Sequence, residues 1–458
     1  MIIQRFRKMK VVSGWLMLLF VLTLTRTGSA FADADTQKLL DKISALEAKV
    51  SQLEGRVSMT EHVGPGKEVV PHAAPSGEGL LKSVEDIHVG GYVSTGYNYN
   101  WLSPNPDGDG GTARAAGVAN ANGNNTNIRA FDRDANSFGH NGQLEFEKMA
   151  NEAGTAGFRA DLMFGRDAQI LNAATFGDQV DQFFVEQAYV HYIAPIGNGI
   201  DIKAGRFVTI AGAEVIESKD NWNSSRSLLF TNAIPFTHNG ILGSYKLNDM
   251  VDVKLGLANG WDTAVDNNKS KTVLSQVALH PAKGIDFTQN FLIGSEQTRA
   301  VGGGAGRIAD GHTRGLLDSV LAVTPLPDNE RWKLLLKFDY GWEEKVGLVG
   351  NGAGQWHGFA AGTKYDVNDW LTLAGRWEYF SDTDGARLTG LNGLLGTERN
   401  TIFEMTYTAD VKLAKNLISR LEWRYDSSTD PIFDLSNNSA VGARDGQHTV
   451  GAEMIYAF

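Results

Sequence analysis

Charged side chains recur at alternate positions in several segments of this sequence, each opposite a row of apolar residues. In residues 332–343, Lys337, Asp339 and Glu343 alternate with leucine, phenylalanine, tyrosine and tryptophan, and Leu335 is the exception on the charged face. Successive side chains of a strand point to opposite faces, so the segment is predicted to be a strand with one charged and one apolar face. A row of charges in water attracts ions of one sign and repels the other, as charged rings do in channels. This pattern therefore favours a site that selects ions and solutes by their charge.

The same alternation in residues 251–257, 371–379 and 421–426 adds charges to the predicted polar face. The basic candidates for this face are Lys203, Lys254, Lys333, Lys337, Arg376, Arg420 and Arg424. The acidic candidates are Asp252, Asp339, Glu343, Glu378, Glu404, Glu422 and Asp426. Since both signs are present, the sequence does not decide between a preference for cations and one for anions. The alternative for each residue is a charge paired with a neighbour, with no selective role.

Other motifs that could bind ions or cofactors are incomplete. Residues 107–110 and 382–385 resemble parts of calcium loops but lack the remaining ligand positions. The run 302–306 is not a dinucleotide or phosphate-binding motif, and the ten histidines show no ligand spacing. The absence of cysteine excludes disulfides, thiolate zinc sites and iron–sulfur clusters. We therefore predict no metal, no cofactor and no catalytic residues.

Alternating segments account for most of the sequence between residues 87 and 458. We predict about sixteen strands, at 87–101, 138–149, 156–167, 182–194, 200–210, 238–248, 250–260, 272–281, 285–297, 314–324, 331–344, 355–367, 369–382, 400–412, 416–426 and 446–458. The prediction is weakest at 182–194, where Glu186 lies on one face and Gln187 and His191 lie on the other.

The connections between these strands alternate in length. Long, polar, mostly glycine-rich segments are predicted at 102–137, 168–181, 211–237, 261–271, 298–313, 345–354, 383–399 and 427–445, with short turns in between. An even strand number with short turns at one end and long loops at the other is typical of bacterial outer-membrane barrels. Trp332 and Trp342 bracket one apolar face, as in the aromatic girdles of such barrels. The predicted fold is an all-β, antiparallel transmembrane barrel.

The long segment 211–237 differs from the others because it is first charged and then apolar. Its charged residues are Glu214, Glu217, Lys219, Asp220 and Arg226. The apolar runs 228–230 and 234–236 follow, and apolar residues of an external loop need burial. A barrel of sixteen strands encloses water, so the loop could fold back into the lumen. We predict that this loop narrows the lumen and that its charges form the constriction.

The last predicted strand ends on an aromatic residue. Val450, Ala452, Met454, Tyr456 and Phe458 share its apolar face. The segment looks like the closing strand of a bacterial outer-membrane barrel. In such barrels the terminal phenylalanine resembles a signal that the barrel-assembly machinery reads. Tyr456 and Phe458 are therefore the predicted insertion signal.

The first 85 residues are predicted to form three further parts. Residues 1–32, with a basic start, an apolar stretch and small residues before Ala32, have the layout of a signal peptide. The apolar stretch is short for the alternative, an uncleaved membrane anchor. Residues 35–58 carry apolar residues at steps of four and three, which predicts a coiled coil. Residues 59–85 form a predicted linker, and residues 86–458 the barrel.

The oligomeric state of the predicted coiled coil is open between two and three chains. β-branched residues at a, Ile43, Val50 and Val57, with leucine at d favour a dimer. Porins of the type suggested below are usually trimers, and we predict a homotrimer. A single amphipathic helix is the simpler alternative.

Residues 204–240 and 256–269 resemble the signature region of the OmpL-like outer-membrane β-barrel porin family, a relative of the phosphate-selective porin group. This similarity extends over residues 86–458 and implies an outer-membrane channel. It does not imply phosphate selectivity, because no ladder of lysines or arginines is visible and the formal net charge is −11. The negative charge also argues against a nucleic-acid partner.

The expected function is that of an outer-membrane porin, a water-filled channel for passive diffusion of small hydrophilic solutes and ions, with no enzymatic activity. Its expected partners are outer-membrane lipid, other copies of the chain and the barrel-assembly machinery, and the coiled coil would lie in the periplasm. One alternative is an envelope tether that acts through residues 35–58. Another is an enzymatic barrel, although no nucleophile motif stands near His191 or His448.

Overall fold

The computed structural model describes residues 87–102, 128–131, 136–176, 181–266, 268, 270–296, 312–344, 353–382, 384–388, 400–430, 432–433 and 444–458. The predicted signal peptide (1–32), coiled coil (35–58) and linker (59–85) lie outside these residues. Among the residues described, no helix is long and apolar enough to cross a membrane.

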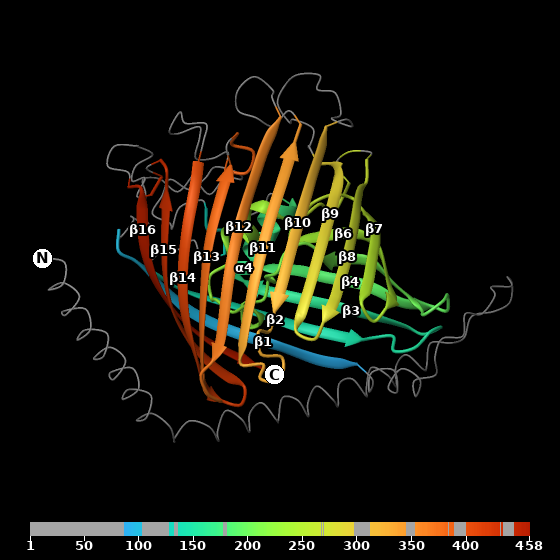
Figure 1. Ribbon diagram of the computed structural model, residues 1–458, viewed down its shortest axis with the longest axis horizontal. Coiled ribbons are helices and arrows are strands. Elements are labelled where there is room, and N and C mark those ends of the chain that lie inside the picture. Colours follow the sequence, from blue (N-terminus) through green and yellow to red (C-terminus); the bar gives the residue numbers. More distant parts are fainter. Residues whose placement is uncertain are drawn as a thin grey trace, which may run out of the picture. The chain divides into compact units, whose positions relative to one another are not determined.

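Strands dominate the described residues (Figure 1). The first eight are β1 (His88–Asn100), β2 (Ser137–Lys148), β3 (Ala156–Gly165), β4 (Phe183–Ala194), β5 (Ile200–Val208), β6 (Thr237–Asn248), β7 (Val251–Ala258) and β8 (Thr272–Ala282). The others are β9 (Ile285–Ser295), β10 (Thr313–Val323), β11 (Trp332–Glu343), β12 (Gly354–Asp366), β13 (Leu371–Asp382), β14 (Asn400–Ala414), β15 (Leu417–Ser428) and β16 (Gly446–Ala457).

The strands form one closed antiparallel barrel. Each strand pairs with its neighbours in sequence, and β16 pairs with β1, where Tyr92 lies opposite Ala457. Beyond β16, the Phe458 N–H donates to the Gly91 carbonyl at 3.0 Å, and the Gly91 N–H donates back at 3.1 Å. A closed barrel leaves no unpaired strand edge, which is the condition for a sheet in lipid. The predicted sixteen-strand antiparallel barrel is confirmed, with each strand end within two residues of its predicted place.

The two faces of each strand meet different surroundings. In β11, Leu336 and Phe338 point outward and are 41% and 40% exposed, whereas Lys337 and Asp339 point into the lumen and are 4% and 0% exposed. The apolar side chains therefore form the outer surface, and the charges are inside. This is the reverse of a soluble protein and suits a barrel whose outer surface lies in lipid.

A bulge in β4 explains why this strand shows no clean alternation. Asp161 pairs with Gln187, and the next pair is Leu162 with Val185, so Glu186 has no partner in the register. A bulge places two successive residues opposite one, which shifts the side-chain alternation by one position. Glu186 and Gln187 are consequently both buried.

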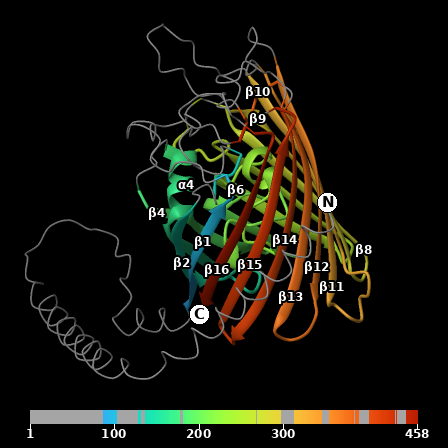
Figure 2. The same cartoon turned by 90° about the vertical axis from the view of Figure 1, so that its left-hand side faces the viewer.

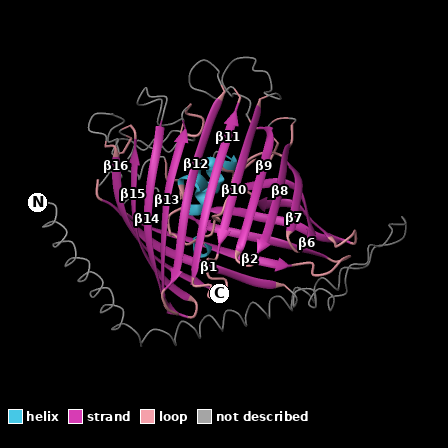
Figure 3. Cartoon of the chain, in the orientation of Figure 1, coloured by secondary structure: helices cyan, strands magenta, loops and turns pink. Residues whose placement is uncertain are grey.

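Among the described residues, several segments from the long-loop end are buried in the barrel interior, and three of them form the site described below. They are residues 128–131, the helix α4 (Arg166–Phe176) between β3 and β4, and the long connection 209–236 between β5 and β6. The long connection, called here the inward loop, contains the 3₁₀ turn η1 (Ser218–Asp220) and the π-helical turn η2 (Leu229–Ala233). Figure 3 shows the helical segments in cyan within the ring of strands, and Figure 2 shows α4 beside β4.

Two expectations for the long segments are wrong in part. The segment 168–181 is predicted to be a loop, but α4 occupies its residues 168–176, because Ala168, Ile170 and Leu171 pack inside the barrel. The segment 102–137 is predicted to be a long polar loop. However, the Phe131 ring lies in the interior, 5.6 Å from that of Phe230.

The adjacent residues Leu335 and Leu336 provide a test of the inside and outside of the barrel. Leu336→Arg places a charge on the lipid face, where the expected loss of folding free energy is about 2–4 kcal/mol near the bilayer midplane. Leu335→Arg places the same charge in the lumen and is expected to cost much less. The measurement is urea unfolding in lipid vesicles, followed by heat-modifiable electrophoretic mobility. Equal losses in the two variants would contradict the assignment of the faces.

Candidate functional site

The inward loop leaves β5 and crosses the lumen to the charged wall, the name used here for the lumen face of β10–β16. Carboxylates of this wall accept hydrogen bonds from backbone N–H groups of the loop. Glu422 accepts from Ser224 at 2.7 Å and from Ser225 at 2.9 Å, and Glu378 accepts from Leu228 at 2.7 Å. A loop without regular structure must find partners for its peptide groups when it is buried. The acidic residues of the wall supply them.

Arginines of the same wall bind the loop's carbonyl groups. Arg376 donates to the Ser225 carbonyl at 2.7 Å, Arg420 to the Ser218 carbonyl at 2.8 Å and Arg424 to the Arg226 carbonyl at 2.7 Å. Hydrogen bonds with one charged partner are stronger than neutral ones. The loop is therefore held along its polar half by donors and acceptors of two strands of the wall, β13 and β15.

The charges of the wall are also paired with one another. Arg376 lies 3.1 Å from Glu404, Arg420 lies 2.8 Å from Asp410, and Arg424 lies 2.7 Å from Asp426. Lys337 lies 3.1 Å from Asp339. Buried charges are tolerated only when they are paired in this way. Many of the predicted lumen charges thus hold the loop and each other.

The second half of the inward loop is held by apolar contacts. Leu228, Leu229, Phe230 and Ile234 are almost completely buried. Leu229 fits against Gly358 of β12, where an added Cβ would lie only 2.3 Å from the leucine Cδ2. The Trp356 indole N–H donates to the Ala233 carbonyl at 3.1 Å. The apolar runs of the loop are buried in the barrel interior.

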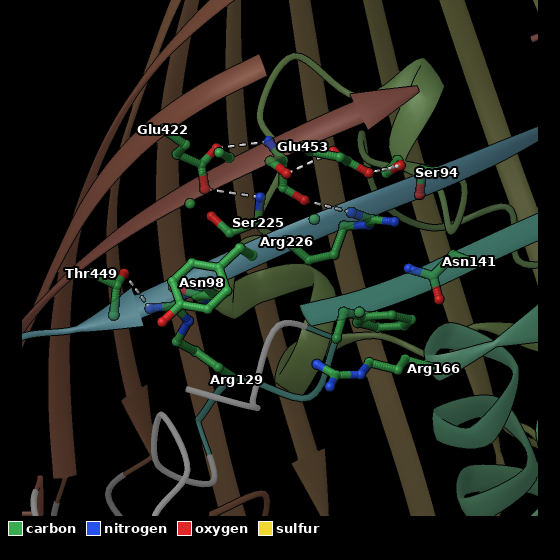
Figure 4. Close-up of a pocket in the computed structure, with 18 of the residues that line it drawn as sticks. Ser94, Asn98, Arg129, Asn141, Arg166, Ser225, Arg226, Glu422, Thr449 and Glu453 are labelled. Carbon is green, nitrogen blue, oxygen red and sulfur yellow. Dashed lines mark hydrogen bonds between the residues drawn. The ribbon is translucent and has the colours of Figure 1, made fainter. Parts of the chain in front are cut away.

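A cavity of about 100 Å³ lies between the inward loop, the first residues of α4 and the lumen side of β16, β1 and β2 (Figure 4). Four arginines line it, so we call it the arginine cavity: Arg129, Arg166, Arg226 and Arg424. Its carboxylates are Asp167, Glu422 and Glu453. The strands contribute Gly96, Gly139 and Gly451 with small polar residues, which leave room beside the loop.

A second cavity of about 490 Å³ lies at the short-turn end of the barrel. We call it the inner cavity. It is lined by loop residues 219–222, by Arg420 and by charged residues of the turns, among them Arg331 and Lys412. Ser218, Ser224 and Glu453 line the arginine cavity, so the loop segment 218–224 separates the two spaces. Glu453 accepts from both serine hydroxyls, at 2.8 and 2.7 Å, and lies 3.8 Å from Arg420.

The five predicted constriction residues occupy different positions. Arg226 lines the arginine cavity, and Lys219 and Asp220 form a 2.6 Å ion pair at the inner cavity. Glu214 lies 2.8 Å from Arg376 and lines a third, smaller space. Glu217 is buried against Gln143 of β2, at 3.2 Å.

The predicted lumen charges fall into two groups. Those that contact the inward loop or its immediate partners are Lys337, Asp339, Arg376, Glu378, Glu404, Arg420, Glu422, Arg424 and Asp426. The remaining candidates line none of the three spaces described above: Lys203, Lys254, Lys333, Asp252 and Glu343. The aromatic rings of Tyr456 and Phe458 are about half exposed on the outer surface.

Sequence reasoning missed Arg129, because it lies in a long connection for which alternation predicts nothing. It missed Arg166 and Asp167 because the predicted strand 156–167 includes them, whereas β3 ends at Gly165 and α4 begins at Arg166. It also missed Glu453, although this residue stands on the polar face of the last strand. Its position between Ala452 and Met454, which lie on the apolar face, was enough to predict that Glu453 points into the lumen.

Burial changes the acidity of three groups on the connections. It raises the pKa of Asp167 to about 6, although Arg226 lies 3.5 Å away and opposes the shift. It raises the pKa of Glu217, which the hydrogen bond from Gln143 opposes. It lowers the pKa of Arg129 to about 9, and the neighbouring Arg424 acts in the same direction. At neutral pH Arg129 stays charged, whereas Asp167 is close to its titration range.

Comparison with known proteins gives one family and a common fold. A family model described as "Putative beta-barrel porin-2, OmpL-like" matches residues 86–458. No curated protein matches the sequence.

Solved structures that resemble this chain include a loop L8 deletion mutant of OmpT, an outer membrane protein of Vibrio cholerae, with 10% identity and a TM-score of 0.51. They also include the outer membrane channel DcaP of Acinetobacter baumannii, with 12% identity and a TM-score of 0.50. OprB of Pseudomonas putida has 11% identity and a TM-score of 0.50. The matches cover 81%, 81% and 83% of this chain and 99%, 97% and 96% of the others. At these identities the likeness concerns the barrel fold alone.

The carboxylate of Glu422 provides a test of how the inward loop is held. Glu422→Gln removes the charge that accepts from the Ser224 and Ser225 amides, a type of hydrogen bond worth about 1.5–3 kcal/mol. We expect these two amides to exchange with solvent at least about tenfold faster, as measured by hydrogen–deuterium exchange. Glu343→Gln is the matched control, because Glu343 is also buried but pairs with Arg314 at 2.8 Å. Equal exchange in both variants would show that Glu422 does not anchor the loop.

Proposed function

This chain belongs to the OmpL-like β-barrel porin family, and from this premise we propose how its lumen carries solutes. The chain is an outer-membrane porin, a channel for passive diffusion of small hydrophilic solutes. In our proposal the inward loop is the constriction of this channel. Transport is diffusion along charged and polar side chains, with no covalent bond made or broken and hence no enzymatic step.

The observation that carries this proposal is the arrangement of two cavities on either side of one short loop segment. The arginine cavity is lined by residues next to the long connections, such as Asn98, Ser137 and Arg166, and the inner cavity lies at the short-turn end. Residues 218–224, with Glu453 and Arg420, stand between them. A solute that passes along β16, β1 and β2 would meet this segment as the narrowest part of its path. The position suits a constriction that selects by charge.

The loop charges have two roles in this proposal. Arg226, Lys219 and Asp220 face the cavities and act on passing solutes, because their positions on the path let them attract or repel charge. Glu214 and Glu217 position the loop, since they contact Arg376 and Gln143 of the barrel. The lumen charges that bind the loop, such as Arg376 and Glu422, are positioning residues as well.

The remaining parts of the chain complete the proposal. Residues 1–32 direct export and are removed, residues 35–58 form a periplasmic coiled coil that joins three chains, and residues 59–85 link it to the barrel. Tyr456 and Phe458 are read by the barrel-assembly machinery. The heptads of 35–58 and the outward position of the two aromatic rings support these assignments.

Single-channel recording in a planar bilayer tests the proposed function. The folded, heat-modifiable protein is expected to produce stable current steps that occur in threes, because three barrels insert together. A salt gradient across the bilayer then gives the sign of the charge preference through the reversal potential. Folded protein that conducts no current would disprove an open channel, and steps that occur singly would disprove the trimer.

Asp167 gives the arginine cavity a charge that changes near pH 6. Burial raises the pKa of this residue to about 6, and the groups around it are Arg226 of the inward loop, Arg166 of its own helix, Glu453 of β16 and Tyr92 of β1. As the pH falls from about 7 to 5, Asp167 binds a proton and loses its negative charge, so the net charge of the cavity becomes more positive by one. We expect the permeability ratio of chloride to potassium to increase over this range, as measured by the reversal potential.

Asp167→Asn is the control for this titration. The variant lacks the negative charge at every pH, so its permeability ratio should already be high at pH 7 and show no step near pH 6. A step that persists in the variant would assign the titration to another group.

A further inference from the structure

The inner cavity is the largest of the three spaces beside the inward loop, and two tryptophans line it. Its volume of about 490 Å³ is that of a ligand pocket, whereas the other two spaces measure about 100 and 120 Å³. Trp222 comes from the inward loop, and Trp370 comes from the short turn between β12 and β13. A space of this size can hold a whole small molecule rather than one of its groups.

We propose that the inner cavity binds a small neutral saccharide. The apolar faces of its sugar rings lie against the two tryptophans, and its hydroxyl groups bond to the charged side chains around them. This inference rests on the proposed function, since it names saccharides as a class of solute that the channel carries. It places their binding site on the short-turn side of the loop segment 218–224.

Trp370 provides the first argument, because it presents a large apolar ring to the cavity. The residue is 55% exposed and lines the inner cavity together with Thr372, whereas Leu373 is exposed on the outer surface. Residues 370 and 372 therefore lie on the lumen side. An apolar ring in contact with water gains free energy when a ligand covers it. The CH groups on one face of a sugar ring can cover an indole ring while the hydroxyl groups at its edge remain free to form hydrogen bonds.

Trp222 provides the second argument, because the wall holds it in line with further polar groups. Its ring lies beside Gly362 of β12, where an added Cβ would be 3.5 Å from the ring carbon Cζ3. Lys364 and Asp366, at the next two lumen positions of β12, also line the cavity. A strand rises about 3.3 Å per residue, so Gly362 and Asp366 are about 13 Å apart along β12. This row leads from Trp222 towards the turn that carries Trp370, and its length suits linked sugar rings better than a single ring.

The third argument is the balance of charge around the cavity. Its lining contains five basic and four acidic residues. Six of them lie in pairs of opposite charge, Arg420 with Asp410 at 2.8 Å, Lys219 with Asp220 at 2.6 Å and Lys364 with Asp366 at 3.9 Å. Charges that nearly cancel give little net attraction to an ion of either sign. A hydroxyl group both donates and accepts hydrogen bonds, so it can bond to the basic and to the acidic members of these pairs. The lining therefore favours a neutral molecule with many hydroxyl groups.

Maltose is the probe, because it is a neutral molecule with two linked sugar rings. Saturation-transfer difference NMR measures its binding to the full-length, heat-modifiable protein, in a detergent without a sugar head group. We expect saturable transfer to the ring protons of maltose and much less transfer to sorbitol, which has hydroxyl groups but no ring. Trp370→Ala is expected to weaken maltose binding by about tenfold, because one apolar contact surface is lost. Trp370→Phe keeps an aromatic ring and should fall between the two.

Trp332→Ala is the matched control. Trp332 is 39% exposed near the same end of the barrel, but it lies on the outer surface and lines none of the three spaces. The variant should bind maltose as the unchanged protein does. Equal weakening in Trp370→Ala and Trp332→Ala, or equal transfer to maltose and sorbitol, would overturn the saccharide site. If Trp370→Ala fails to fold, the comparison of Trp370→Phe with Trp332→Phe decides the question in the same way.

Planar-bilayer recording separates this inference from the proposed function. Maltose on both sides of the bilayer is expected to reduce the current more than sorbitol of equal osmolality does, and Trp370→Ala should remove this difference. Equal reduction by the two solutes in the unchanged protein would overturn the saccharide site and leave the channel intact. Saturable maltose binding in a protein that conducts no current would support the site and overturn the channel.

Discussion

The structure depends on the hydrogen bonds that join the inward loop to the charged wall. A loop that enters a barrel brings peptide groups that lose their contact with water, and each needs a new partner. Glu378 and Glu422 accept from its N–H groups, and Arg376 donates to its carbonyl groups. The same contacts compensate the burial of the wall's charges, which would be costly without them. Loop and wall therefore stabilise each other, and the spaces beside the loop keep their shape.

Alternation in the sequence was sufficient to predict the barrel, because the side chains of a strand have only two directions. Two residues that break the alternation, Glu186 and Leu335, also mark special features of the structure. Glu186 did not fit the pattern of its strand, and the structure shows a bulge there. Leu335 was the apolar residue on a charged face, and together with Trp222 of the inward loop and Gly362 it lines the third space. The first departure from the pattern marks a bulge, and the second marks a place where the inward loop lies close to the barrel wall.

The arginine cavity could be predicted only in part. Arg226, Glu422 and Arg424 are among the predicted charges, whereas Arg129 and Arg166 come from connections whose paths depend on tertiary contacts. Arg166 follows β3 directly, but alternation gives no information about the direction of a side chain after a strand ends. Arg129 enters the lumen next to Phe131, whose ring packs against the loop's Phe230. In the same way, strand alternation selected Lys333 and Lys254 along with Arg424. It does not show how deep in the barrel a charge lies, or which side of the lumen the loop will cover.

The pairing of β1 with β16 determines the order in which this protein can be assembled. Tyr92 must meet Ala457, so the last contact of the ring joins residues from opposite ends of the barrel sequence. All other strand pairs are formed between neighbours and can develop one hairpin at a time. Until the final strand arrives, the growing sheet has two unpaired edges that can join another chain. Contacts of such long sequence separation form slowly. Before closure, the unpaired edges of β1 and β16 are the parts of the sheet that a chaperone would need to cover. The Gly91–Phe458 hydrogen bonds form when the barrel closes.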